Sequence, residues 1–152
     1  MVALLVWIIG LNLIATLIAS YAPPNNDLWY QSLPQSKLTP PDFVFPIAWT
    51  FLYATLGTSG WLIFNRSNPI AWSLAVVYLL HLILNGLWSP VFFGWHHPGL
   101  ALVILIAMLI TLLILMLLAR TTQPMIGWLL TPYLAWLVFA TYLNAAVLFD
   151  LP

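Results

Sequence analysis

Residues 100–118 read LALVILIAMLITLLILMLL, an apolar run that only Thr111 interrupts. A helix needs about 20 predominantly apolar residues to cross the hydrocarbon core of a bilayer. A membrane β-barrel would instead show segments of about ten residues with alternating hydrophobicity. The run therefore predicts a membrane-spanning helix, and it predicts that the other spans of the chain are helical as well.

The whole chain of 152 residues has the composition of an integral membrane protein. Hydrophobic residues make up 64% and charged residues 4%, and the mean hydropathy is +1.05. A soluble domain has about 25% charged residues, so this chain has too few charges to cover a water-facing surface. Three basic residues cannot form a patch that binds nucleic acid. We therefore expect a multi-pass membrane protein with no nucleic-acid partner.

Clusters of Pro, Asn, Asp and charged residues divide the chain into apolar segments, which we expect to form a single domain over residues 1–152. The expected helical spans are residues 2–21, 42–64, 69–92, 99–119 and 125–149. The first connection, residues 22–40, is much longer than the other three. Long loops of this kind are uncommon and usually functional. Because this one contains Trp29, Tyr30 and Leu33, we expect it to fold back over the bundle as a lid.

Four of the five spans carry one stripe of polar and aromatic residues at helical spacing. The stripes are Asn12, Thr16 and Ser20; Trp49, Thr50, Tyr53 and Gly57; His81, Asn85, Trp88 and Ser89; and Tyr133, Trp136, Ala140 and Asn144. Polar groups inside a bilayer are costly unless they are bonded or line a cavity. We expect the stripes to enclose a pocket; the alternative is that they only hydrogen-bond between packed helices. The fourth span, with Thr111 alone, is expected to face lipid or a second subunit.

Nine tryptophans give the chain its most unusual side-chain content. Most lie near span ends, where indole rings collect at the headgroup level, but Trp49, Trp88 and Trp136 lie deeper or on the stripes. A wall of such rings suits a flat conjugated ligand, because each ring pair adds about 0.5–1.5 kcal/mol beyond area burial.

No metal centre is expected from the histidines. His96 and His97 have no carboxylate or thiol close in sequence, and a structural zinc site needs about four ligands. His81 lies inside a span, where we expect a neutral, hydrogen-bonded imidazole; an axial bond to haem iron is the alternative.

Catalytic motifs are absent from the sequence. It has no paired carboxylates in a span, no phosphate-binding glycine loop and no HExxH. Asp27, Asp42 and Asp150 all lie at span edges, which disfavours a proton-coupled pump. The remaining enzymatic possibility is photochemistry, in which a bound photosensitiser and oxygen meet a nearby tryptophan.

Three blocks of the sequence are similar, in order and spacing, to the motifs of the TspO/MBR family, the tryptophan-rich sensory proteins and mitochondrial translocator proteins. The first block contains Trp29-Tyr30 and residues 40–53, PPDFVFPIAWTFLY. The second is LNGLWSPVFFG at residues 84–94, and the third is PYLAWLVFATYLN at residues 132–144. Together they extend over most of the chain.

The resemblance implies a five-helix bundle, usually a homodimer, with a pocket closed by the first loop. It implies binding of porphyrins such as protoporphyrin IX, of haem and of other flat hydrophobic ligands, in a sensor or regulator of the tetrapyrrole or stress response, with no obligatory cofactor. Alternatives are a hydrophobic-ligand transporter and light-dependent porphyrin degradation, for which Trp49 and Trp136 occupy the implicated motif positions. The candidate ligand-binding residues are Trp29, Pro41, Phe45, Trp49, Tyr53, Asn85, Trp88, Tyr133, Trp136, Phe139, Ala140 and Asn144.

The sequence also departs from the family pattern. Leu38 and Phe43 stand where many members have tryptophan, and the first span lacks the usual glycine-rich run. The sterol-recognition segment is missing after residue 144, so cholesterol transport is not predicted. The short C-terminus and apolar loops favour a bacterial cell membrane. For the expected homodimer, the chain offers only Ala54, Gly57 and Gly60 as a small-residue face.

Overall fold

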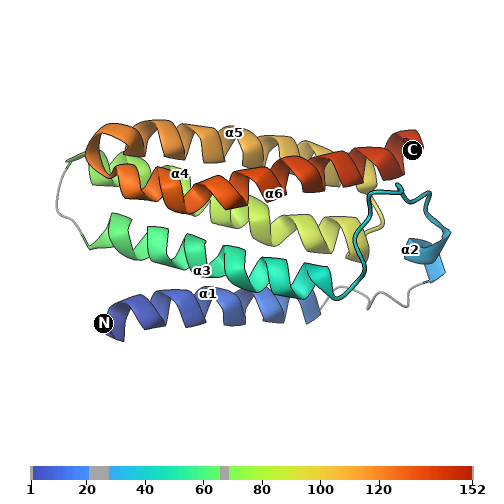
Figure 1. Ribbon diagram of the computed structural model, residues 1–152, viewed down its shortest axis with the longest axis horizontal. Helices are drawn as coiled ribbons and strands as arrows, with labels where there is room; N and C mark the ends of the chain where they lie inside the picture. The colour runs from blue at the N-terminus through green and yellow to red at the C-terminus, as the bar shows by residue number, and fades with distance from the viewer. Residues whose placement is uncertain (1, 21–27, 66–68, 152) are drawn as a thin grey trace.

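The computed structural model describes residues 2–20, 28–65 and 69–151, and within these residues every regular element is helical (Figure 1). The elements are α1 (Val2–Ser20), α2 (Leu28–Ser32), α3 (Val44–Phe64), α4 (Pro69–Ser89), the π-helix η1 (Pro90–Gly94), α5 (Pro98–Thr122) and α6 (Pro124–Phe149). Five helices are long and apolar enough to cross a membrane, which confirms the expected five-span membrane protein. The expected break at residues 23–27 and the loop around Arg66 lie outside the described residues.

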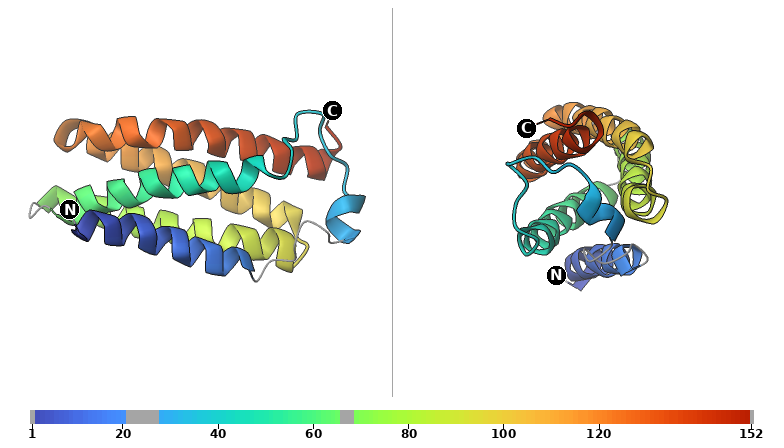
Figure 2. Two further views of the ribbon diagram at one scale, coloured as in Figure 1. Left: turned by 60° about the horizontal axis from the view of Figure 1, so that its bottom comes forward. Right: turned by 90° about the vertical axis from the view of Figure 1, so that its right-hand side faces the viewer.

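The five long helices form a ring in which sequence neighbours are not always spatial neighbours. α1 packs against α3, α3 against α6, α6 against α5 and α5 against α4, while α4 makes smaller contacts with α3 and α1. The end-on view in Figure 2 shows the segment that contains α2 passing across one end of this ring. The first loop therefore takes the position of a lid, as expected from the sequence.

Burial differs sharply between α5 and α1. α5 buries one face in the core, including Leu105, Met108 and Leu112, while Val103 and Ile110 on its other face are exposed. The exposed face of α5 is available to lipid or a subunit, as expected, while its other face packs between α4 and α6. α1 has no buried residue at all, so it lies at the periphery of the bundle.

Two glycines of α3 allow helices to approach closely. A Cβ atom at Gly57 would lie 2.8 Å from Cα of Ile8 in α1, and one at Gly60 would lie 2.5 Å from Oη of Tyr78. The Tyr78 hydroxyl uses this space to donate to the carbonyl of Leu56 at 2.9 Å. The two glycines that the sequence offered as a dimer face are therefore used in contacts within the chain.

The helical path of α4 continues beyond its expected end at residue 92. Pro90 has no N–H to donate, and the chain forms the π-helical turn η1, in which the N–H of Trp95 donates to the carbonyl of Pro90 at 2.9 Å. Single π-turns are rare and frequently occur at functional sites. Phe92 and Phe93 in this turn line the cavity described below.

Candidate ligand-binding cavity

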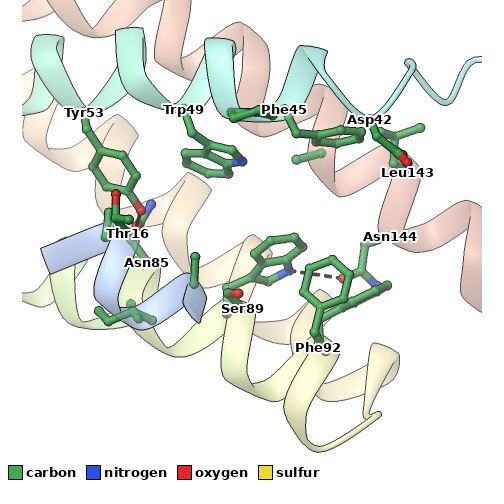
Figure 3. Close-up of a pocket in the computed structure, with 18 of the residues that line it drawn as sticks. Thr16, Asp42, Phe45, Trp49, Tyr53, Asn85, Ser89, Phe92, Leu143 and Asn144 are labelled. Carbon is green, nitrogen blue, oxygen red and sulfur yellow. Dashed lines mark hydrogen bonds between the residues drawn. The ribbon is translucent and has the colours of Figure 1, made fainter. Parts of the chain in front are cut away.

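A cavity of about 420 Å³ lies inside the ring of helices, between α1, α3, α4 and α6 (Figure 3). We call residues 28–43, which cover its end, the lid. Sites for small molecules usually measure about 300–1,000 Å³. The lining residues are Asn12, Ala15, Thr16, Ile18, Ala19, Tyr30, Gln35, Thr39, Asp42, Phe45, Pro46, Trp49, Thr50, Tyr53, Asn85, Gly86, Trp88, Ser89, Phe92, Phe93, Ala140, Leu143, Asn144 and Val147.

Aromatic rings form two facing walls of the cavity. Trp49 of α3 lies 6.5 Å from Trp88 of α4 between ring centroids, with their planes 32° apart. Trp49 contacts Tyr53, with ring centroids 5.5 Å apart, and Trp88 stacks on Phe92, with ring centroids 5.6 Å apart. Figure 3 shows Trp49 and Phe92 on opposite sides of the open space. The rings present flat faces to whatever occupies the cavity.

The closed end of the cavity is backed by a chain of hydrogen bonds whose direction can be assigned. The Thr111 hydroxyl donates to the carbonyls of Ala107 and Met108, both at 3.0 Å. Its oxygen is therefore free to accept from Nδ1–H of His81, also at 3.0 Å. The other ring nitrogen, Nε2, then accepts from the hydroxyl of Tyr133 at 3.0 Å. This pattern defines His81 as the neutral Nδ1–H tautomer, as expected for a bonded imidazole within a span.

The same chain continues to the cavity wall. Nδ2 of Asn85 donates to the oxygen of Tyr133 at 2.7 Å, and Oδ1 of Asn85 accepts from the hydroxyl of Tyr53 at 2.5 Å. Both nitrogens of His81 are thus occupied. No imidazole nitrogen remains there for haem iron, so the structure does not support the axial-ligand alternative. Buried groups that are fully satisfied in this way hold one geometry.

A second set of hydrogen bonds fixes Trp88 in the cavity wall. Nε1 of Trp88 donates to Oδ1 of Asn144 at 3.3 Å, and Nδ2 of Asn144 donates to the carbonyl of Pro98 at 2.8 Å. Asn144 therefore ties α6 both to α4 and to the start of α5. The indole N–H of Trp88 is used in this contact and is not offered to a ligand.

The lid closes the other end of the cavity with fewer constraints. Tyr30 packs on Phe93 at 5.3 Å, and the hydroxyls of Ser36 and Tyr142 lie 2.9 Å apart. Partial burial is the main cause that raises the pKa of Tyr30, and the nearby charge of Asp42 raises it further, while a hydrogen bond with the Gln35 side chain lowers it. The mouth of the cavity is therefore lined by polar side chains, and Asp42 is the one charged residue of the described lining.

Comparison with known sequences agrees with this architecture. Residues 3–149 match the profile of the TspO/MBR family. The chain belongs to the TspO/MBR family. It is 34% identical over 138 residues to the tryptophan-rich protein TspO of Chlorobaculum tepidum, covering 86% of this chain and 84% of that protein.

Other similar TspO/MBR proteins come from distant organisms. The translocator protein of Homo sapiens is 35% identical over 128 residues, covering 78% of this chain and 72% of that protein. The tryptophan-rich sensory protein of Cereibacter sphaeroides is 32% identical over 118 residues, covering 78% of this chain and 73% of that protein. The similarity therefore extends over most of the TspO/MBR chain in each case.

Seven of the residues that the sequence put forward line the cavity. They are Phe45, Trp49, Tyr53, Asn85, Trp88, Ala140 and Asn144. The other five lie elsewhere: Tyr133 is fully buried behind Asn85, and Pro41 lies in the lid between the lining residues Thr39 and Asp42. Trp29 stacks on His96 outside the cavity, with ring centroids 4.1 Å apart.

Trp136 and Phe139 face a different hollow from Trp49. They line a second groove between α3 and α6, together with Ala48, Phe51, Leu52, Pro132 and Ala135. Trp136 still contacts Trp49, with ring centroids 6.4 Å apart and planes at 80°. Its buried Nε1 has no hydrogen-bond partner among the described residues. The two tryptophans named as a photochemical pair are therefore in contact, but only Trp49 borders the cavity inside the ring of helices.

The lining residues that sequence reasoning missed include two groups with polar or aromatic side chains. Phe92 and Phe93 belong to the family block at residues 84–94 and could have been named from it. Gln35, Thr39 and Asp42 come from the lid, and nothing in their spacing predicts which of them turn inward. Their position depends on the path of the lid, which the Ser36–Tyr142 contact fixes across a separation of 106 residues.

Proposed function

We propose that this membrane protein binds porphyrin-type tetrapyrroles and other flat hydrophobic molecules, and that it acts as a sensor or regulator in the bacterial cell membrane. The observation that carries the proposal is the ring-lined cavity, in which Trp49 and Trp88 face one space. Protoporphyrin IX or haem would be held by stacking and shape, because both His81 nitrogens are already hydrogen-bonded. The name of the Cereibacter sphaeroides relative, a sensory protein, supports the sensor role.

A fluorescence titration tests this proposal directly. Protoporphyrin IX added to the detergent-solubilised protein should quench tryptophan emission with a saturable curve. Trp49→Phe should weaken the affinity by about three- to tenfold, since it removes part of one ring pair. The matched control is Trp128→Phe, because Trp128 is 80% exposed on α6 and should leave the affinity unchanged. If quenching is linear, or equal in both variants, the polar stripes serve only as packing contacts.

Light-dependent porphyrin degradation is the second candidate function. It is favoured by the contact between Trp49 and Trp136, which links the cavity wall to a second indole ring. Illumination of the saturated protein in air should then yield a porphyrin product detectable by mass spectrometry. The double variant Trp49→Phe/Trp136→Phe should bind within about tenfold of the parent yet form no product. Equal loss of porphyrin in parent and double variant would remove this candidate.

The expected homodimer also remains a proposal. With Gly57 and Gly60 packed against α1 and Tyr78, the exposed apolar side of α5, which includes Val103 and Ile110, is the more suitable face for a second copy. Cross-linking through single cysteines placed at these two positions in lipid would test it, and the cysteine-free sequence makes the background low.

A further inference from the structure

The mouth of the cavity carries one charged side chain among the described lining residues, and it is an acid. Asp42 lies at the end of the cavity beside Leu143, opposite the edge at which Tyr53 and Asn85 lie (Figure 3). No Lys, Arg or His of the described residues lines the space. A guest that enters the cavity therefore meets a negative charge with no positive charge to balance it.

The described residues do not neutralise this carboxylate. Lys37 lies on the same lid, but it does not line the cavity, and no ion pair joins it to Asp42. Its charge also acts on a neighbour: after burial, it is the second cause that raises the pKa of Tyr30, another residue of the mouth. Because Asp42 is the one charged residue of the described lining, we expect the mouth to have a negative potential.

The other polar groups of the described lining are neutral, so they offer hydrogen bonds to an anion but no opposite charge. The Tyr53 hydroxyl donates its proton to Asn85, so its oxygen presents lone pairs. The indole N–H of Trp88 is held by Asn144. Other neutral donors also line the space, among them Nε1 of Trp49, the Gln35 amide and the Thr39 and Ser89 hydroxyls, but none of them carries a formal positive charge to balance a facing carboxylate.

We infer that Asp42 is a specificity-determining residue: the cavity selects flat guests whose edge at the mouth is neutral or cationic, and it selects against guests that place carboxylates there. The inference rests on the proposed function and narrows it, since it ranks tetrapyrroles by the charge of their side chains. An esterified or amine-bearing macrocycle fits the mouth better than the free diacid does.

The test compares protoporphyrin IX with its dimethyl ester, which has the same ring and no carboxylate. Both are titrated against the parent protein, Asp42→Asn and Asp150→Asn by tryptophan quenching at low ionic strength. Asp150→Asn is the matched control: it makes the same change of charge outside the cavity, and its left-handed backbone (φ 52°) suits asparagine. The ester differs from the diacid in its partitioning into detergent as well as in charge. The quantity compared between variants is therefore the ratio of the diacid affinity to the ester affinity.

We expect Asp42→Asn to tighten binding of the diacid by about threefold, the size typical of a partly exposed charge contact, and to leave the ester unchanged. Asp150→Asn should leave both affinities at the parent values. The inference is overturned if Asp42→Asn leaves the ratio unchanged, or if Asp150→Asn shifts it equally. In either case, saturable quenching of the parent protein by protoporphyrin IX would still support the proposed function. If neither porphyrin quenches the parent saturably, both the function and the inference fail.

Discussion

The two ends of the cavity are built differently. At the closed end, Tyr53 and Asn85 belong to a hydrogen-bonded chain in which each donor has an acceptor. At the mouth, Asp42 and Gln35 are exposed, and the lid is held by ring contacts such as that between Tyr30 and Phe93 and by the contact between Ser36 and Tyr142. We therefore expect the closed end to fix the shape of the cavity and much of the stability around it, and we expect the mouth to control ligand entry and release.

Gly57→Val should have the largest effect, because it acts just beyond the closed end. Its Cβ would clash with the backbone of Ile8, 2.8 Å away, and α1 would have to move off α3. We expect a loss of about 1–3 kcal/mol in the free energy of unfolding and weaker porphyrin binding, since α1 contributes Asn12 and Thr16 to the lining. Thermal unfolding in detergent measures the first effect and quenching the second.

The control for this variant is Gly10→Val on α1, where an added Cβ would meet no atom within 4 Å. It shares the helix-propensity cost of valine without the clash. Equal destabilisation by the two variants would mean that the α1–α3 contact is not close in the membrane.

Two tyrosine-to-phenylalanine variants test the two ends of the cavity independently. Tyr133→Phe leaves Nε2 of His81 and Nδ2 of Asn85 without their partner, and should cost about 1–2 kcal/mol of unfolding free energy. Tyr142→Phe removes the hydroxyl that meets Ser36 in the lid; it should cost about 0.5 kcal/mol or less but speed porphyrin dissociation.

Stopped-flow dissociation and thermal unfolding on the same samples compare these two variants. We expect Tyr133→Phe to have the larger effect on thermal unfolding and Tyr142→Phe the larger effect on porphyrin dissociation. If Tyr133→Phe exceeds Tyr142→Phe in both, the lid does not control release.

The smallest expected effect is the pH dependence of porphyrin release, which involves Tyr30 in the lid. Because the pKa of Tyr30 is raised above its ordinary value of 10.0 in the folded lid, the unfolded phenol ionises first as pH rises. The contribution of Tyr30 to lid stability is therefore complete below pH 10 and is lost as pH rises through the folded pKa. Porphyrin dissociation should accelerate above pH 10 in the parent and much less in Tyr30→Phe, with tyrosinate absorbance as the independent readout.

Much of the bundle and of the cavity walls could be predicted from the sequence. Helix length and apolar runs identify five spans, and polar residues four apart identify the inward faces, such as Asn12 with Thr16 and Trp49 with Tyr53. These predictions succeed because they depend on local spacing and on the cost of polar groups in lipid.

Trp136 and the lid show where sequence reasoning ends. Trp136 shares a helical stripe with Ala140, yet it faces the groove between α3 and α6, because residues four apart are offset around a helix and α3 packs between the two hollows. The inward turn of Asp42 depends on contacts between distant segments. The directions of Trp136 and Asp42 cannot be predicted from residue spacing, because both depend on how distant segments pack together.

The most direct test is an experimental structure of the protein with protoporphyrin IX bound. The ring lies between Trp49 and Trp88 beneath the lid if the cavity is the binding site, and Tyr53 remains hydrogen-bonded to Asn85. A macrocycle seated instead in the groove of Phe51 and Trp136, with the space beside Trp49 empty, would contradict the proposal.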